Sequence, residues 1–218
     1  MLGLTDVTKI YPRQPGIVRP LDGITLSVES GEFVAVQGPS GSGKTTLLLT
    51  AGGLLRPDEG RVFLDEQNLY EMNPDERARF RAKNIGFVFQ QYHLIPYLTV
   101  LENVMTPNLA QLSSNSRGRA NKLIEHFGLT ERSGHTPGEL SAGEKQRTAL
   151  ARALFHQPKI LFADEITGNL DQQNAHIVLN YLKEFAQSGG AVLLVTHDVQ
   201  VAQSAQKKWS LVNGQLSF

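Results

Sequence analysis

Short apolar runs recur along the chain, separated by longer stretches of mixed polarity. A run of about four to eight apolar residues that stops at a glycine or at acidic residues is typical of a buried β-strand. Such runs predict strands over residues 33–37, 61–64, 85–89, 160–163 and 191–195, followed by a strand-like stretch at 209–212.

The stretches between these strands carry apolar residues at helical spacing. Residues 44–51 are good helix formers, and apolar residues at i, i+3, i+4 and i+7 predict amphipathic helices at 120–127 and 177–185. Residues 91–143 are predicted to be mainly helical, with one loop at 113–118. Strands that alternate with helices indicate an α/β fold, in which helices cover a mostly parallel sheet.

The most specific motif is a glycine-rich loop between a predicted strand and a predicted helix. Its residues are Gly38, Pro39, Ser40, Gly41, Ser42, Gly43, Lys44 and Thr45, followed by Thr46. They match G-x-x-x-x-G-K-[ST], the phosphate loop of nucleotide-binding proteins. Glycines let successive backbone N–H groups converge on phosphate oxygens, and the helix N-terminus adds positive potential. We expect Lys44 to bridge the β- and γ-phosphates of a nucleotide and the Thr45 hydroxyl to ligate Mg²⁺.

Two adjacent acidic residues follow the apolar strand predicted at 160–163. We expect Asp164 to hold Mg²⁺ and Glu165 to polarise the attacking water as a general base. A strand that ends in two acids is common in proteins without any catalytic role, so the pair gains its meaning from the phosphate loop upstream. Together the two motifs predict a nucleotide-hydrolysing enzyme.

A third motif, Leu140-Ser-Ala-Gly-Glu-Lys-Gln-Arg147, precedes the same strand. With it the chain resembles the ATP-binding-cassette (ABC) ATPases, whose signature reads LSGGQ and continues with a basic Gln-Arg stretch. Four further residues match positions of that family's motifs. Tyr11 stands where the family has the aromatic residue that stacks on adenine, and Gln90 matches the Q-loop glutamine. Asp171 lies in the stretch 167–171 that matches the D-loop, and His197 matches the switch histidine. The resemblance covers essentially the whole chain.

The resemblance implies a fold and a division of the chain. It implies a single P-loop ABC ATPase domain over residues 1–218, with a mostly parallel core and an antiparallel β-subdomain in 1–90 and 144–218. Residues 91–143 would form a helical lobe that presents the signature.

The resemblance also implies ligands and an assembly. ATP and Mg²⁺ would be bound, with Thr45, Gln90 and Asp164 at the metal and with Glu165, His197 and Gln90 in catalysis. Two chains would pair head to tail. The signature residues Ser141, Ala142, Gly143 and Glu144 of one chain would then complete the ATP site of the other.

Three of these assignments have alternatives in the residues themselves. Tyr11 could be an ordinary strand aromatic, because the length of chain before the phosphate loop varies. Gln90 could cap a strand end, and His197 could be a hydrogen-bonded loop histidine. Their neighbours in the sequence and their family positions favour the site roles.

Three positions depart from the family pattern. Ala142 replaces the first glycine of the signature pair, which costs little at negative φ and is strained at positive φ. Glu144 replaces the signature glutamine and is not expected to block function. Ile166 replaces the proline that usually follows the catalytic glutamate. We expect its absence to loosen the D-loop and to affect the hydrolysis rate first.

Composition excludes several functional classes. Lys+Arg and Asp+Glu balance at 21 each, which argues against a nucleic-acid partner and against the cassettes of translation factors. Leu140 stands 50 positions after Gln90, and the interval holds no sustained heptads, which excludes the DNA-repair and chromosome-structuring ATPases with their long coiled coil. The 218-residue chain has no cysteine and no apolar run near the ~20 residues that cross a bilayer, so it is interpreted as intracellular.

A cassette without a membrane span needs a separate permease if it drives transport. The apolar residues at 94–100 follow Gln90 and are expected to pack partly inside the helical lobe and partly against such a permease. The stretch 85–90, the D-loop and the short C-terminus are most similar to the bacterial lipoprotein-release and macrolide-export group.

We therefore expect a cytoplasmic ATPase subunit, peripheral on the inner face of the cell membrane. It would form a homodimer and drive a permease for export, lipoprotein release or the transmission of motion across the membrane. The alternatives are the ATPase of a solute importer and a cell-division cassette that signals across the membrane without transport.

Overall fold

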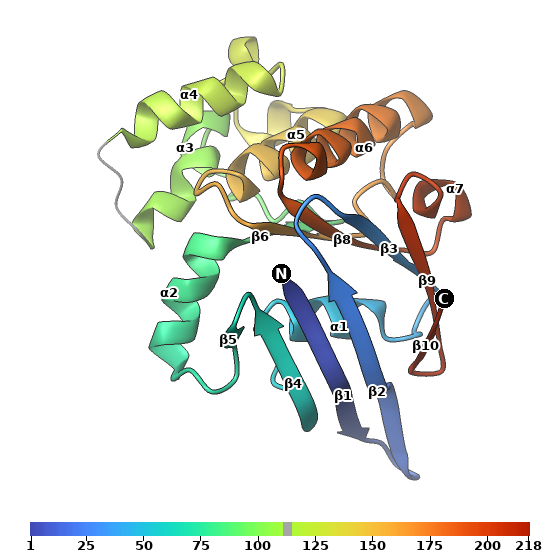
Figure 1. Ribbon diagram of the computed structural model, residues 1–218. Helices are drawn as coiled ribbons and strands as arrows, with labels where there is room; N and C mark the ends of the chain where they lie inside the picture. The colour runs from blue at the N-terminus through green and yellow to red at the C-terminus, as the bar shows by residue number, and fades with distance from the viewer. Residues whose placement is uncertain (111–114) are drawn as a thin grey trace.

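The computed structural model describes residues 1–110 and 115–218 and contains two β-sheets with helices packed around them (Figure 1). The strands are β1 (Leu2–Pro12), β2 (Ile17–Val28), β3 (Phe33–Gln37), β4 (Glu59–Leu64), β5 (Gln67–Asn68), β6 (Ile85–Phe89), β7 (Ile160–Asp164), β8 (Ala191–Thr196), β9 (Lys207–Val212) and β10 (Gln215–Ser217). The α-helices are α1 (Lys44–Ala51), α2 (Pro74–Asn84), α3 (Val100–Met105), α4 (Ser116–His126), α5 (Ala142–Ala153), α6 (Gln172–Gln187) and α7 (Val199–Ala202). Short 3₁₀ helices are η1 (Thr106–Leu109), η2 (Thr130–Arg132) and η3 (Pro137–Glu139).

The larger sheet has six strands in the order β10-β9-β3-β8-β7-β6. Its strands are parallel from β9 through β6, and β10 runs antiparallel to β9. The prediction of a mostly parallel sheet is therefore confirmed. The predicted strands at 33–37 and 85–89 are β3 and β6, and the other four predicted stretches lie within β4, β7, β8 and β9.

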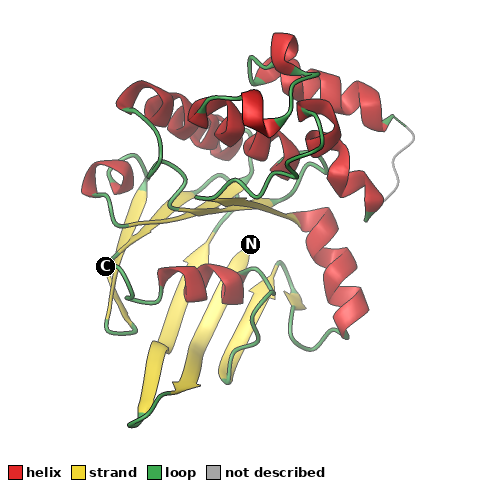
Figure 2. Cartoon of the chain, turned by 180° about the vertical axis from the view of Figure 1, so that it is seen from behind, coloured by secondary structure: helices red, strands yellow, loops and turns green. Residues whose placement is uncertain are grey.

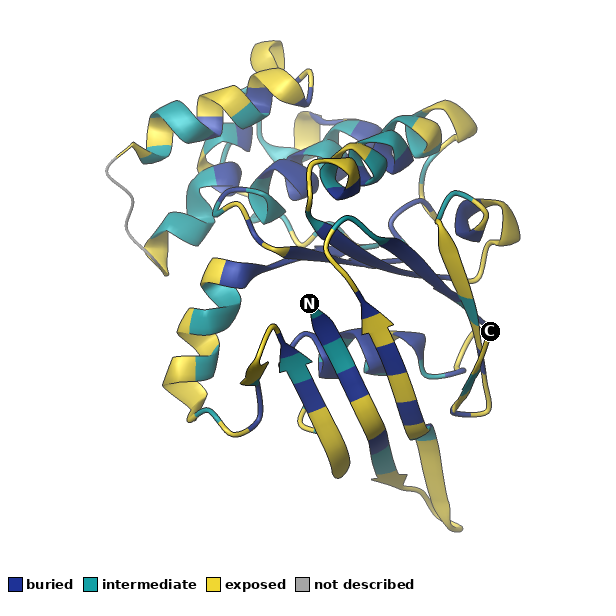
Figure 3. Ribbon diagram, viewed as in Figure 1, coloured by how far each residue is buried: buried dark blue, intermediate teal, exposed yellow. Residues whose placement is uncertain are grey.

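Both faces of the six-stranded sheet are covered, which explains why its central strands are almost wholly apolar (Figure 3). In β8, Leu193 and Val195 belong to one core cluster, whereas Val192 and Leu194 belong to the other. Successive side chains of a strand point to opposite faces, so a strand buried on both sides has no polar position. The sheet thus separates two hydrophobic cores.

Helix α1 packs between the six-stranded sheet and a four-stranded antiparallel sheet of order β2-β1-β4-β5 (Figure 2). It is the helix predicted at 44–51. Strand β1 does not stand out in the sequence because bulges interrupt its period of two. The register of β1 shifts between Leu4 and Val7, and Asp6 between them has a φ of +49°. Buried residues therefore lie three positions apart there, and the pattern of alternation is lost.

Helices α3, α4, α5 and α6 cover the face of the six-stranded sheet that points away from α1 (Figure 1). The helices predicted at 120–127 and 177–185 correspond to α4 and α6. The prediction of a loop at 113–118 is wrong for residues 116–118, which form the first turn of α4; Ser113 and Ser114 lie outside the described residues. Glycine at 118 lets the Asn115 side chain lie close to this turn, because a Cβ there would lie 2.4 Å from Asn115 Oδ1.

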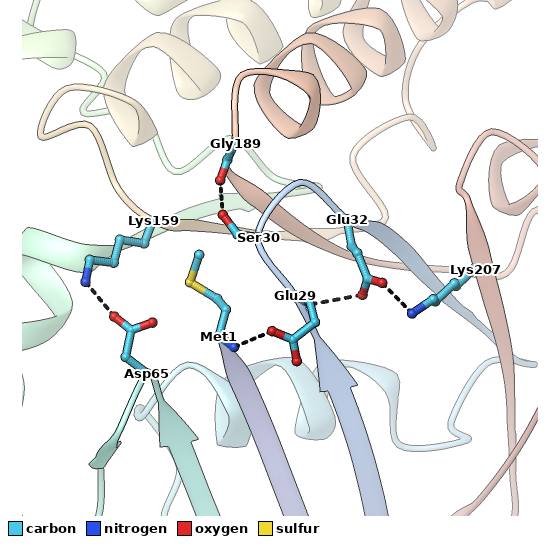
Figure 4. Close-up of polar contacts among 8 residues, drawn as sticks. All are labelled: Met1, Glu29, Ser30, Glu32, Asp65, Lys159, Gly189 and Lys207. Carbon is cyan, nitrogen blue, oxygen red and sulfur yellow. Dashed lines mark hydrogen bonds and ion pairs between the residues drawn. The ribbon is translucent and has the colours of Figure 1, made fainter.

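Polar contacts link chain segments near the amino ends of the parallel strands (Figure 4), and the ion pair between Lys159 and Asp65 joins the two sheets. The α-amino group of Met1 lies 2.8 Å from a Glu29 carboxylate oxygen, and Lys159 Nζ lies 2.5 Å from Asp65 Oδ2. These ion pairs are partly exposed, so each contributes little to stability. The residues of the candidate site lie at the opposite, carboxyl ends of these strands.

Within the described ranges, no helix is long and apolar enough to cross a lipid bilayer.

Candidate functional site

The glycine-rich loop leads from the carboxyl end of β3 into α1. Gly43 is the N-cap of α1 with a φ of +105°, and no side chain caps this helix end. A Cβ at Gly43 would lie 2.1 Å from the carbonyl oxygen of Pro20, so only glycine fits. The first N–H groups of α1 therefore remain without side-chain acceptors, which is the arrangement that binds phosphate.

Two further features of this loop are its close packing on β9 and a buried hydroxyl group. The loop packs closely against β9 at Gly38. A Cβ there would lie 2.3 Å from the Leu211 carbonyl oxygen, so the close approach requires glycine. Ser42 Oγ is buried and has no hydrogen-bond partner among the residues that the structure describes. A buried hydroxyl without a partner costs free energy, and a ligand oxygen would supply the missing bond.

The ammonium group of Lys44 is buried inside the loop. Its Nζ donates hydrogen bonds to the carbonyl oxygens of Gly38 and Pro39, both at 2.9 Å. It also lies 3.5 Å from Glu165 Oε1. A buried cation needs such partners to offset its desolvation. The backbone of the loop thus fixes the ammonium group at the centre of the loop.

Thr45 and Asp164 come from different elements and meet beside the loop. Thr45 Oγ1 donates to Asp164 Oδ2 at 2.9 Å, which brings the start of α1 to the end of β7. Burial raises the pKa of Asp164, although the hydrogen bond from Thr45 acts in the opposite direction. A hydroxyl and a carboxylate oxygen are the hard donors that Mg²⁺ prefers, so this pair fits the metal.

Glu165 and His197 are brought together by the pairing of β7 with β8. Asp164 is in register with Val195, so the residues that follow the two strands lie side by side. His197 Nδ1 lies 2.9 Å from Glu165 Oε2. Glu165 has a φ of +48°, a conformation that is costly for glutamate and is often stored at functional sites. Lys44, Glu165 and His197 thus form one contiguous polar chain.

Gln90 follows β6 and lies against the D-loop. Its backbone oxygen accepts a hydrogen bond from Asn169 Nδ2 at 3.2 Å, and a Cβ at Gly168 would lie 2.9 Å from Gln90 Nε2. No hydrogen bond joins Gln90 to Thr45 or Asp164 in the part of the chain that the structure describes. The metal role expected for Gln90 stays a prediction.

A cavity of about 460 Å³ lies in front of the phosphate loop. It is lined by Tyr11, Pro12, Arg13, Val18, Pro20, Ser40, Gly41, Gly43, Lys44, Thr45, Thr46 and Glu165. Tyr11 is 40% exposed, with Lys9 Nζ 5.6 Å from the centre of its ring, and an exposed aromatic ring can stack on a planar group. The sequence interpretation missed Arg13, although it follows Tyr11 by two residues in a proline-rich turn. A larger cavity of about 980 Å³ lies at the amino ends of the parallel strands and shares no residue with this one.

The signature residues do not line this cavity. Ser141 is the N-cap of α5, where its hydroxyl accepts from Glu144 N and the Glu144 carboxylate accepts from Ser141 N. Ala142 is the first helical residue and is not among the residues of positive φ, so alanine is unstrained there. Gly143 is the constrained position, because a Cβ would lie 2.2 Å from Asn174 Oδ1.

Asn174 connects the signature helix to the D-loop, a link that the sequence motifs did not reveal. Asp171 is the N-cap of α6 and accepts hydrogen bonds from Asn174 N and Nδ2. Arg147 of α5 donates to Asn174 Oδ1 at 3.2 Å. The side chain of Asn174 therefore fills the space beside Gly143 and is fixed from both sides.

Ile166 occupies the position where a proline was expected. Its side chain is 2% exposed and belongs to the hydrophobic core above the sheet. A proline at this position would disfavour helical backbone angles at the preceding residue. The hydrogen bond from Gly168 N to Glu165 O at 3.1 Å spans Ile166. The effect of Ile166 on the hydrolysis rate stays a prediction.

The chain is similar to known proteins over its whole length. A family model described as ABC transporter matches residues 21–168. The lipoprotein-releasing system ATP-binding protein LolD 1 of Rhodopirellula baltica is 42% identical over 219 residues, which cover 99% of this chain and 96% of that protein. The macrolide export ATP-binding/permease protein MacB of Hyphomonas neptunium is also 42% identical, over 218 residues, but this chain spans only 34% of its length.

Solved structures show the same fold. The dimeric structure of MJ0796, a bacterial ABC transporter cassette, superposes on this chain with a TM-score of 0.92 and 38% sequence identity. The match covers 100% of this chain and 97% of the MJ0796 chain. A second structure, a dimeric post-hydrolysis state of the same cassette bound to ADP and Pi, gives a TM-score of 0.91 with 37% identity over 98% of that chain. The fold expected from the sequence, a cassette with a mixed α/β sheet, is confirmed.

Proposed function

This chain belongs to the ABC transporter family as an ATPase cassette, and we propose that it hydrolyses Mg-ATP as a homodimer to drive a separate membrane permease. One observation carries the catalytic part of this proposal. The buried Lys44 ammonium, the Glu165 carboxylate and the His197 ring form a single chain of contacts at the uncapped start of α1.

The residue roles follow from these contacts. Lys44 and the N–H groups at the start of α1 bind the phosphates, and Tyr11 stacks on the adenine. Glu165 takes the proton from the attacking water, while His197 holds the carboxylate at Oε2. Mg²⁺, bound through Thr45, Asp164 and Gln90, would neutralise charge on the phosphates.

The ATP site is completed by a second chain. Ser141 and Glu144 lie outside the cavity of the phosphate loop in their own chain, so the start of α5 is available to the partner's nucleotide. Solved cassettes with this fold have been described as dimers. Two ATP molecules, each held between a phosphate loop and a partner's signature, would make dimerisation a condition of hydrolysis.

The membrane partner would dock on the helical lobe, residues 91–143. Tyr97 is 80% exposed there and Leu109 is 86% exposed, so the lobe offers apolar contacts. The names of the LolD and MacB relatives support a permease of lipoprotein release or macrolide export, with the cassette bound at the inner face of the membrane. A solute importer and a cell-division cassette remain alternatives with the same catalytic site.

The substitution Glu165→Gln tests the catalytic assignment. It preserves the size of the side chain and removes the base, so hydrolysis should fall by roughly 100-fold or more while ATP binding persists. With Mg-ATP the variant should accumulate as a stable dimer, which light scattering would detect. The matched control is Glu125→Gln, the same change on the exposed face of α4. Hydrolysis by Glu165→Gln at the unmodified rate would show that the base is wrongly assigned.

The partner is tested by copurification from native membranes, with Glu165→Gln and Mg-ATP holding the closed dimer. A permease with few spans and a large extracytoplasmic domain is the expected result. Recovery of a many-span permease with a solute-binding protein would favour the importer alternative. If no membrane protein is recovered above the level of a mock purification without this chain, the transport role is contradicted.

A further inference from the structure

Glu144, which stands where the signature has glutamine, is held tightly in the structure. Its carboxylate accepts from Ser141 N at 2.7 Å through Oε2 and from Arg132 Nε at 2.9 Å through Oε1. The backbone hydrogen bond from Ser141 is the largest cause that lowers the pKa of Glu144 to about 2, and Arg132 adds to it. Glu144 is therefore ionised throughout the physiological range.

An ionised carboxylate at this place raises an electrostatic problem. In the proposed dimer, the start of α5 approaches the γ-phosphate of the partner's ATP, where positive potential favours binding. Glu144 takes up part of that potential and adds a negative charge to the approaching face. Like charges brought together with little water between them repel strongly. A glutamine at this position would not create this repulsion.

Arg132 supplies a counter-charge from a separate segment. It ends η2, whose position is fixed by hydrogen bonds from Arg132 N to Leu129 O and from His135 N to Arg132 O. The next residues are tied to α3, because Leu101 N donates to Ser133 O at 3.0 Å. The side chain of Arg132 is 44% exposed and that of Glu144 is 18% exposed, so the pair lies at the surface and contributes little to the stability of a single chain.

We propose that Arg132 is a positioning residue for the signature: it holds Glu144 against the Ser141 backbone and cancels its charge on the face that closes on the partner's ATP. This inference rests on the proposed sandwich dimer. Arg132 and Glu144 then act as a unit that replaces the neutral glutamine of the signature. Loss of Arg132 alone leaves an uncompensated charge, whereas loss of both charges does not.

A double-mutant cycle tests this inference in the Glu165→Gln background, where the ATP-bound dimer accumulates. The ATP concentration at half-maximal dimerisation is measured for Arg132→Gln, Glu144→Gln and the double variant. We expect Arg132→Gln to raise that concentration roughly tenfold, about 1.4 kcal/mol. The double variant is expected to return to the value of Glu144→Gln alone, and Arg132→Lys, which keeps the charge, to fall between Arg132→Gln and the parent.

A matched control and a structural readout accompany the cycle. Arg117→Gln removes the same charge from an exposed position of the same lobe and should not shift the dimerisation midpoint. Thermal unfolding of Arg132→Gln should stay close to that of the parent, because the lost ion pair is at the surface.

The outcomes separate the two proposals. An equal penalty from Arg132→Gln with glutamate or glutamine at 144, or no penalty at all, would overturn the inference and leave the dimer intact. Failure of the Glu165→Gln parent to dimerise with Mg-ATP would overturn the sandwich and the inference with it.

Discussion

Two helix N-termini are central to this cassette, and they are finished in opposite ways. Helix α1 begins at the phosphate loop with a glycine N-cap and no side-chain acceptor. Helix α5 begins at the signature with a complete capping box, in which Ser141 and Glu144 satisfy each other's backbone N–H groups. One helix end is left open for a ligand, and the other is already partly satisfied by its own chain.

The difference indicates a division of labour. The open end of α1 is surrounded by Lys44, Thr45, Asp164 and Glu165 within one chain, so we expect a single chain to bind a nucleotide there. The capped end of α5 has a fixed geometry and does not line the phosphate-loop cavity of its own chain. In the proposed sandwich dimer, it would contribute a few directed groups to the nucleotide that the other chain holds. The predictions below test that asymmetry.

Lys44→Ala should produce the largest effect. It removes the charge that the Gly38 and Pro39 carbonyls hold at the centre of the loop, so ATP affinity of the isolated chain should fall by roughly 100-fold, or about 3 kcal/mol. Ser141→Ala, in the same calorimetric titration, should change the affinity by less than about threefold. Comparable losses for both variants would show that the two helix ends share one site within a chain.

The two small residues of the signature should respond very differently to exchange. Gly143→Ala drives a Cβ into Asn174 Oδ1, at 2.2 Å, and should lower the free energy of unfolding by about 2 kcal/mol. Ala142→Gly restores the family pattern but should cost only about 0.5–1 kcal/mol, from the lower helix propensity of glycine. Urea unfolding of both variants measures the difference. A smaller loss for Gly143→Ala than for Ala142→Gly would contradict the described contact with Asn174.

The capping box should give a smaller, pH-dependent effect. Because the pKa of Glu144 is lowered from 4.5 to about 2, its contribution to stability is fully present above pH 4.5 and is lost as the pH falls toward 2. The free energy of unfolding of the unmodified protein should exceed that of Glu144→Gln by about 1 kcal/mol at pH 6. That difference should shrink as the pH is lowered below 4.5. A difference that stays constant from pH 6 to pH 3 would argue against the ionised carboxylate as its source.

The sequence was sufficient to place the motif residues because of how parallel sheets are built. Asp164, Glu165 and His197 follow adjacent parallel strands, so knowing where those strands end is enough to bring the side chains to one edge. The same reasoning joins Thr45 to Asp164, since the phosphate loop follows β3 of the same sheet. Period and spacing are local properties, and this part of the site depends on them.

The remaining contacts depend on packing that no local pattern encodes. Asn174 beneath Gly143 and Arg132 on Glu144 join residues from separate turns, whose paths are set by the helices around them. The bulges of β1 hid its alternation, and the start of α4 was read as a loop because polar and glycine residues fill its first turn. Helix α2 was missed because it is highly charged and carries no apolar stripe.

The central claim, that the signature of one chain faces the phosphate loop of another, is open to direct measurement because the chain contains no cysteine. Two chains would be prepared in the Glu165→Gln background, one with Ser40→Cys and the other with Ser141→Cys, both at exposed positions. They would be mixed and treated with a short bifunctional thiol reagent, with and without Mg-ATP. We predict a covalent dimer between the two different chains that forms only with ATP. Failure to form it with ATP, together with an internal cross-link in a chain that carries both substitutions, would contradict the account.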